Sequence, residues 1–239
     1  MRERCVTKPL FAFDIDGTLI DTRASFTRIV KEISAATDDD IRRFRDTGAF
    51  NDDWELTRAL VSWIGAGRPK IVERCESVSD VVAWCGHDPG DLAPRCIDRY
   101  RGGYWRDEQR LLSGLRLREL EAYVDVVACT GRDAWEFERG QELLGHRFAA
   151  FTTIEQGKKP AAAALLRLLR PSSSLILFFG DTHADRRTVN AARLLRPDLR
   201  FAFVLVDEAH PVAAVVDAVL THRDPMRALS FAEPMDSHG

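Results

Sequence analysis

Two acidic side chains follow the first apolar segment of the chain. The run Phe11-Ala-Phe-Asp14-Ile-Asp16-Gly17-Thr18 places two aspartates one residue apart after an apolar stretch. Aromatic and β-branched residues suit a buried strand, and Gly17 ends it because glycine adopts backbone angles that other residues avoid. Neighbouring carboxylates repel each other unless a divalent cation or a shared proton offsets their charge. The pair therefore predicts a functional site. An EF-hand calcium loop is disfavoured, since Thr18-Leu-Ile20 lacks the alternating oxygen ligands.

Two later apolar segments also end in polar residues. The segment 124–129 leads into Thr130-Gly131-Arg132, and the segment 175–179 leads into Gly180-Asp181, with Asp185 four residues further on. The carboxyl ends of parallel strands meet at one edge of a sheet, where open α/β folds bind their ligands. Lys158-Lys159-Pro160 stands at the start of a predicted helix and brings a cation to that edge. We expect these side chains to converge.

Phosphoryl transfer is the chemistry that this set of residues suits. Asp14 would be the nucleophile that takes a phosphoryl group and passes it to water. Asp16 would give a proton to the leaving oxygen and later accept one from water. Asp14, Asp181 and the backbone carbonyl of Asp16 would hold Mg²⁺. Thr130, the Gly131 amide and a lysine would hold the phosphoryl oxygens.

The elements between the motifs divide the chain into two parts. Alternating strands and helices from Leu115 to Leu220 predict a doubly wound parallel sheet, an α/β fold with helices on both faces. Helical spacing prevails between Ile20 and Gly114, with no convincing strand, which predicts an all-helical insertion. We expect a discontinuous core of residues 1–20 and 113–239 and a helical domain of residues 21–112.

Individual elements follow from periodicity and from capping residues. In the insertion, Pro69 is expected to open one helix that closes near Gly86. The tail from Thr221 is polar and is expected to be loose. In the core the predicted helices span 115–122, 134–144, 160–170, 185–195 and 212–220, and the predicted strands span 124–129, 148–153, 175–179 and 201–206.

Composition excludes several classes of protein. Of 239 residues 45% are apolar and 30% charged, with a net charge of −3, so nothing points to nucleic acid or to an anionic membrane surface. The apolar runs are too short to span a bilayer, and residues 1–8 are too polar for a secretion signal. Five irregularly spaced cysteines indicate free thiols in a reducing compartment. A soluble cytoplasmic protein is expected.

Four ordered motifs resemble those of the haloacid dehalogenase (HAD) superfamily. They are Asp14-Ile-Asp16-Gly-Thr-Leu, Thr130-Gly-Arg132, Lys159-Pro160 and Gly180-Asp181-Thr-His-Ala-Asp185, and the resemblance covers residues 5–20 and 113–220. It implies a Rossmann-like core, Mg²⁺ dependence and an aspartyl-phosphate intermediate. The helical insertion resembles the type 1 cap of subfamily IA phosphatases, and the run 50–57 is similar to a signature within that group. The namesake dehalogenases lack an acid at the position of Asp16, so its presence favours phosphoester chemistry.

The resemblance also implies roles for single residues. The family lysine commonly stands directly before proline, which favours Lys159 as the catalytic lysine, with Lys158 as a phosphate contact or a surface charge. Gly17 would contact the phosphate through its backbone. Arg132 would face the phosphate or form a surface salt bridge. Asp185 would join Asp14, Asp16 and Asp181 around the metal, the alternative being a helix cap.

For a few residues the sequence allows both a structural and a functional role. Asn51 and Asp53 are first of all helix-start residues and Trp54 a core residue, with substrate contact as the alternative. His183 is read as a surface residue, with a catalytic role as the alternative.

The predicted function is that of a Mg²⁺-dependent phosphatase. Its substrate would be a small phosphorylated metabolite such as a sugar, cyclitol or amino-alcohol phosphate. A phosphomutase built on the same core is the enzymatic alternative, and a non-catalytic phosphate-binding module is the alternative from another class. No nucleic-acid or membrane partner is expected, and both monomer and homodimer stay open.

Overall fold

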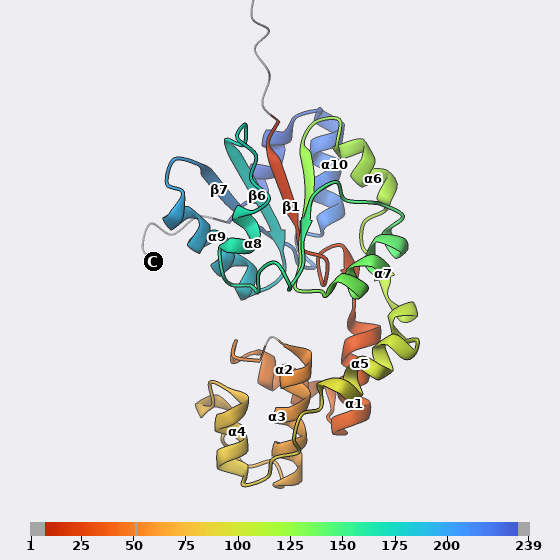
Figure 1. Cartoon of the computed structure of the whole chain (residues 1–239), viewed down its shortest axis with the longest axis vertical. Coiled ribbons are helices and arrows are strands. Elements are labelled where there is room, and N and C mark those ends of the chain that lie inside the picture. The colour runs from red at the N-terminus through yellow and green to blue at the C-terminus, as the bar shows by residue number, and fades with distance from the viewer. Residues whose placement is uncertain (1–7, 51, 234–239) are drawn as a thin grey trace, which may run out of the picture. The chain divides into compact units, whose positions relative to one another are not determined.

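The computed structural model describes residues 8–50 and 52–233 (Figure 1). The chain divides into two compact units, a core unit made of the residues up to Asp21 and from Gln109 onward, and a helical unit from Thr22 to Glu108. Asn51 lies outside the described residues, and its predicted role with it.

A five-stranded parallel sheet forms the centre of the core unit. The strand order is β5-β4-β1-β6-β7, and every neighbouring pair is parallel. The prediction of a doubly wound α/β fold is confirmed. The strands are β1 (Leu10–Phe13), β4 (Asp125–Cys129), β5 (Phe151–Thr152), β6 (Leu175–Gly180) and β7 (Arg200–Leu205).

Helices cover both faces of this sheet (Figure 1). Phe11 and Phe13 of β1 point into a core shared with α6, α7 and α10, whereas Leu10 and Ala12 point into one shared with α8 and α9. This alternation follows from the two-residue period of a strand and buries β1 completely. The helices are α6 (Gly114–Leu120), α7 (Ala134–Leu144), α8 (Ala163–Leu166), α9 (His183–Leu195) and α10 (Val212–His222).

A short antiparallel ladder lies where the chain leaves and re-enters the core unit. The strands β2 (Ile20–Asp21) and β3 (Gln109–Arg110) pair Ile20 with Arg110 and Asp21 with Gln109. The prediction of no strand between Ile20 and Gly114 was therefore wrong for these residues. Two-residue strands are too short to leave an alternating pattern in the sequence.

The helical unit packs around its own apolar cluster, in which Phe44 contacts the rings of Phe50 and Trp63. The described residues of this unit form helices and no strand, in agreement with the helical periodicity. The elements are η1 (Arg23–Thr27, a π-helix), α1 (Arg28–Ser34), α2 (Asp38–Arg45), α3 (Asp53–Gly65), η2 (Val72–Arg74), α4 (Val78–Cys85), α5 (Ala93–Gly102) and η3 (Tyr104–Asp107).

Four predicted elements differ from the structure, and one of them, the strand 148–153, is reduced to the two residues of β5. The single helix after Pro69 is wrong, because Ser77 adopts an extended conformation and its side chain accepts a hydrogen bond from the Asp80 amide as the cap of α4. The predicted helix 160–170 shrinks to the four residues of α8. The tail is not loose up to residue 233, since η4 (Pro225–Phe231) is followed by a bridge from Ala232 to Val204.

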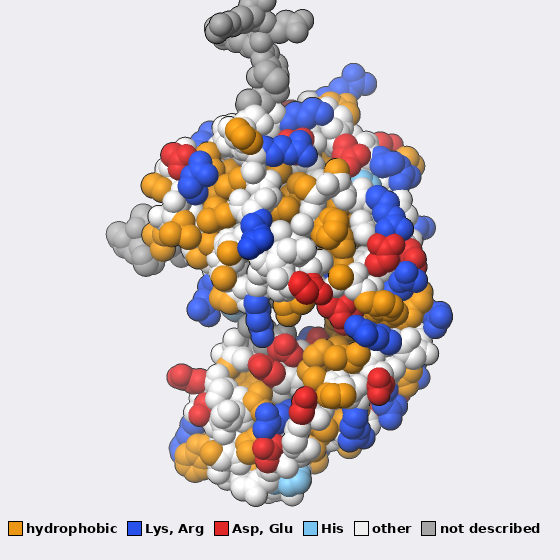
Figure 2. Space-filling view, viewed as in Figure 1, with side chains coloured by type: hydrophobic (Ala, Val, Ile, Leu, Met, Phe, Trp, Pro, Cys, Tyr) orange, Lys and Arg blue, Asp and Glu red, His pale blue; other side chains and the backbone are white. Residues whose placement is uncertain are grey.

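The surface and the thiols are consistent with the composition. On the face of the core unit shown in Figure 2, acidic and basic side chains are interspersed. The four described cysteines are free, as predicted, and Cys5 lies outside the described residues. Within residues 8–50 and 52–233, no helix has the length and the apolar character needed to cross a membrane.

Candidate active site

The ends of three neighbouring strands bring the predicted motifs together. Phe13, the last residue of β1, pairs with Ala128 of β4 and with Phe179 of β6. The next residue, Asp14, continues the ladder by donating its amide to the Phe179 carbonyl at 2.9 Å. The motifs that follow β1, β4 and β6 therefore lie side by side, as expected for the carboxyl edge of a parallel sheet.

Asp14 is buried at the centre of this edge, with 4% of the residue exposed. Its Oδ1 accepts a hydrogen bond from the Ile15 amide at 2.8 Å, and its Oδ2 lies 2.7 Å from Lys159 Nζ. Burial raises the pKa of Asp14 well above its ordinary value, and the neighbouring Asp185 and Asp16 charges add to this, while Lys159 opposes it. An ionised Asp14 therefore depends on positive charge nearby.

Lys159 bridges two carboxylates. Its Nζ lies 2.7 Å from Asp14 Oδ2 and 2.6 Å from Asp185 Oδ1. Burial alone would lower the pKa of Lys159, but Asp14 and Asp185 outweigh it and the pKa is raised. Lys159 is therefore a permanent cation here. The neighbouring Lys158 is exposed, so the geometry favours Lys159 of the two candidates.

Asp185 serves as part of a helix cap and as a partner of the lysine. Thr182 is the N-cap of α9, and its side chain accepts from the Asp185 amide. Asp185 Oδ2 in turn accepts from the Thr182 amide at 3.1 Å and from its hydroxyl at 2.6 Å, while Oδ1 accepts from Lys159. The capping alternative from the sequence thus describes a real contact, and the metal role stays a prediction. His183, the first residue of α9, is exposed.

Oxygen atoms of Asp14, Asp181 and Asp185 lie within 4.8 Å of one another. Burial and the Asp185 charge raise the pKa of Asp181 to about 7. Oxygen-only donors are those that Mg²⁺ prefers.

The charge balance around this cluster is also informative. Among the described residues, the carboxylates of Asp14, Asp16, Asp181 and Asp185 outnumber the two cations that contact them, Lys159 and Arg132. A surplus of carboxylates over cations suits a divalent cation, so the donor set and its charge fit Mg²⁺.

Gly17 is needed for the approach of Asp181. Its φ is +68°, and an added Cβ would lie 2.0 Å from Asp181 Oδ2. Glycine at this position therefore allows both the left-handed turn and the close packing of the carboxylate.

The loop after β4 supplies the remaining predicted residues. Thr130 is buried, donates its amide to the Thr152 carbonyl at 3.0 Å, and accepts the Arg132 amide on Oγ1 at 3.1 Å. Gly131 is exposed at the turn of the loop.

Arg132 forms a salt bridge, as one sequence alternative proposed, but a buried one and not one at the surface. Its guanidinium is fully buried and contacts Asp16 Oδ1 through Nε at 2.8 Å and Nη2 at 2.6 Å. A contact between Arg132 and phosphate stays a prediction. Sequence reasoning missed the pairing with Asp16. A glycine inside α7, Gly140, was the available signal, because an added Cβ there would lie 3.2 Å from Arg132 Nη1.

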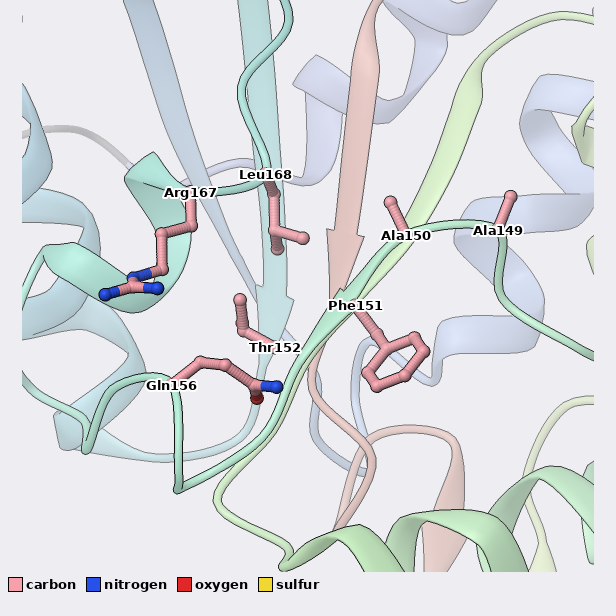
Figure 3. A pocket seen from close by; sticks show the side chains of 7 residues that line it. All are labelled: Ala149, Ala150, Phe151, Thr152, Gln156, Arg167 and Leu168. Carbon is pink, nitrogen blue, oxygen red and sulfur yellow. The ribbon is translucent and has the colours of Figure 1, made fainter.

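A surface pocket of about 470 Å³ lies at the β5 edge of the sheet (Figure 3). It is lined by the segment 149–152 with Gln156, Arg167 and Leu168. Its walls hold no carboxylate and only one cation, so the strand-end cluster, and not this pocket, is the candidate active site.

Comparison with known proteins identifies the family. A model of the haloacid dehalogenase-like hydrolases matches residues 8–193. The chain therefore belongs to the haloacid dehalogenase-like hydrolase family. No curated protein sequence matches it.

Solved structures with similar folds come from several organisms. A phosphatase from Thermococcus thioreducens superposes with a TM-score of 0.75 at 24% identity, over 89% of this chain and 99% of the other. A haloacid dehalogenase-like family protein from Streptococcus pneumoniae gives 0.53 at 13% identity, over 94% and 91%. L-2-haloacid dehalogenase from Xanthobacter autotrophicus gives 0.51 at 13% identity, over 97% and 91%. At these identities the likeness is one of fold, and the fold is common to phosphatases and dehalogenases.

Proposed function

We propose that this hydrolase is a Mg²⁺-dependent phosphatase that acts on a small phosphorylated metabolite. The main support for this proposal is the buried Asp14 carboxylate, which contacts Lys159 and lies close to the carboxylates of Asp181 and Asp185 at the sheet edge. Asp16 supports phosphoester chemistry over dehalogenation, because transfer from an ester requires a proton for the leaving oxygen. A cytoplasmic location stays a prediction from the composition.

The reaction would proceed in two displacements. In the first, an Asp14 oxygen attacks phosphorus, the bond to the ester oxygen breaks, and Asp16 gives that oxygen its proton. In the second, water attacks the same phosphorus, Asp16 takes a proton from the water, and the bond to Asp14 breaks to release phosphate. Atoms and charge balance, and both aspartates return to their first state.

The surrounding residues would stabilise charge rather than react. Lys159 orients Asp14 and offers its charge to the phosphoryl oxygens, while Thr130 and the amides of Gly131 and Gly17 offer donors. Mg²⁺, when bound by Asp14, Asp181 and the Asp16 carbonyl, would neutralise the surplus charge and act as a Lewis acid. Both Asp185 oxygens already accept hydrogen bonds, so we infer that Asp185 supports the ion through its charge. We propose that the helical unit acts as a cap that selects the substrate.

Phosphate release from a panel of sugar, cyclitol and amino-alcohol phosphates, with Mg²⁺ or with EDTA, tests this function. We expect release only with Mg²⁺. Asp14→Asn should lower kcat by more than about a thousandfold, because the amide cannot form the covalent intermediate. Full activity of Asp14→Asn would refute the mechanism.

Asp217→Asn is the matched control, since Asp217 is an exposed acid on α10 paired with Arg116; its activity should equal that of the unaltered protein. The same time courses separate the alternatives. A phosphomutase would yield an isomeric phosphate and little free phosphate, and a binding module would retain the ligand without turnover.

A further inference from the structure

The ion pair between Arg132 and Asp16 is asymmetric. Both Arg132 Nε, at 2.8 Å, and Nη2, at 2.6 Å, contact the same carboxylate oxygen, Oδ1. Oδ2 of Asp16 accepts no hydrogen bond from the residues that the structure describes, and 29% of the Asp16 side chain is exposed. The guanidinium thus binds Oδ1 of Asp16 and leaves Oδ2 accessible to another partner.

Arg132 is itself held firmly. Its amide donates to Thr130 Oγ1 at 3.1 Å, and its carbonyl accepts the Ile154 amide at 3.0 Å. Its Nη1 donates to the Glu136 carbonyl in the first turn of α7 at 3.1 Å. Backbone and side chain are therefore anchored to the loop after β4, to the loop after β5 and to α7.

Helix α7 makes room for this side chain. Gly140 is buried in the middle of the helix, where glycine is unfavourable. An alanine Cβ there would lie 3.2 Å from Arg132 Nη1 and 3.4 Å from an Ile20 methyl. The helix thus carries its least favourable non-proline residue where the guanidinium passes.

We infer that Arg132 is the positioning residue of Asp16: it holds Oδ1 so that Oδ2 carries the proton exchanged with the leaving oxygen and with water. The inference rests on the proposed phosphatase function. A guanidinium with two nitrogens on one oxygen holds that oxygen in place and leaves the second oxygen of the carboxylate for another partner. A buried ion pair is also a weak source of folding stability, because desolvation offsets its attraction, so stability alone gives little account of it.

Leaving-group dependence distinguishes positioning from a structural role. Phenyl phosphate needs a proton on its leaving oxygen, whereas para-nitrophenyl phosphate, nearly equal in size, leaves as a stable anion. The ratio kcat/KM covers only the steps up to departure of the alcohol. For Arg132→Gln we expect kcat/KM to fall by about 100-fold with phenyl phosphate and by less than about fivefold with para-nitrophenyl phosphate. Arg132→Lys should give an intermediate loss, since one ammonium keeps the charge but not the two-nitrogen grip.

Gly140→Ala tests the position of the Arg132 guanidinium without removing its charge. The variant is expected to fold, because alanine favours the helix more than glycine does. We expect it to displace the guanidinium and to reduce kcat/KM selectively with phenyl phosphate, without lowering Tm. Two variants are the controls. Arg116→Gln removes an exposed arginine paired with Glu119 and Asp217, and Gly102→Ala adds a methyl group at the end of α5 where nothing lies within 4 Å. Neither control should change kcat/KM with phenyl phosphate or with para-nitrophenyl phosphate.

Two results would overturn the inference while the phosphatase function stands: equal losses on both esters, or no loss in folded Arg132→Gln and Gly140→Ala. If Arg132→Gln does not fold, Gly140→Ala decides. Failure of the unaltered protein to release phosphate from any ester with Mg²⁺ would refute the proposed function, and this inference with it.

Discussion

At the scale of single residues, the site depends on close approaches that only glycine permits. Gly17 brings its backbone against the Asp181 carboxylate, and Gly180 does the same for Asp185, whose Cβ would lie 2.7 Å from an added methyl. Asp14, Asp181 and Asp185 can lie close together because the residues that face Asp181 and Asp185 are glycines, which have no side chain. In the proposed mechanism the acids carry out the chemistry, and the glycines leave the space that the acids need.

Gly17→Ala should therefore disturb the proposed metal site as well as the turn. The positive φ costs an alanine about 1–2 kcal/mol, and the Cβ would displace Asp181. We expect a lower Tm and a loss of Mg²⁺ affinity of about 10-fold or more, measured by calorimetry and by the Mg²⁺ dependence of Tm.

Gly145→Ala supplies the comparison for that variant. Gly145 has a similar φ of +66°, but an added Cβ there meets nothing within 4 Å. It should lose stability and keep its Mg²⁺ affinity. Equal loss of affinity in both variants would contradict the role given to Gly17.

At the scale of elements, α7 links the active-site loop to the core. Asp133 and Glu136 form a capping box at its start, with Glu136 Oε2 accepting the Asp133 amide at 3.1 Å. Burial, followed by the Asp133 charge, raises the pKa of Glu136 from 4.5 to about 7. The cap is thus formed by a carboxyl group that ionises reluctantly in the folded protein.

This raised pKa predicts a pH-dependent stability. The folded state holds the proton of Glu136 more tightly than the unfolded chain, so stability is lost as pH rises from about 4.5 to about 7. Glu136→Gln keeps an oxygen acceptor and has no proton to lose as pH rises. It should match the unaltered protein near pH 4.5 and exceed its unfolding free energy at pH 8 by about 1–3 kcal/mol.

Glu138→Gln on the same helix is the control, measured by denaturant unfolding at both pH values. Hydrogen bonding to Arg147 lowers the pKa of Glu138, so neutralising this residue should bring no gain at pH 8. A gain from Glu138→Gln as large as that from Glu136→Gln would show that net charge, and not burial, governs the effect.

At the scale of the whole molecule, the helical unit is inserted at a paired position of the core unit. Asp21 and Gln109 are antiparallel partners at the end of the β2–β3 ladder. A two-residue Asn-Gly turn can join such partners into a hairpin. The core unit also holds all three clustered carboxylates and both nearby cations.

Replacement of residues 22–108 by Asn-Gly should therefore leave a folded core. We expect a cooperative thermal transition, Mg²⁺-dependent stabilisation and hydrolysis of para-nitrophenyl phosphate. The kcat/KM for the preferred metabolite should fall by more than about 100-fold, because binding energy from the helical unit is lost. A core without a cooperative transition would show that the sheet needs the insertion to fold.

The long periodic segments of the core could be predicted from the sequence. Strands β1, β4 and β6 are apolar runs that end in glycine or polar residues, and α7 was predicted with its observed ends, because local spacing determines both. The two-residue strands β2 and β3 could not be predicted, since their pairing joins residues nearly ninety positions apart. The segment 160–170 has helical composition, but only Ala163–Leu166 form an α-helix there.

The sequence by itself determined which chemical groups this protein presents and at which ends of which strands. An acid pair, a threonine, a lysine and a second acid pair are enough to place the chain among HAD hydrolases. Only the tertiary structure decided how the charges pair: Lys159 with Asp14 and Asp185, and Arg132 with Asp16. Pairing depends on distances of about 3 Å between side chains far apart in the chain, and no local pattern of residues encodes such distances.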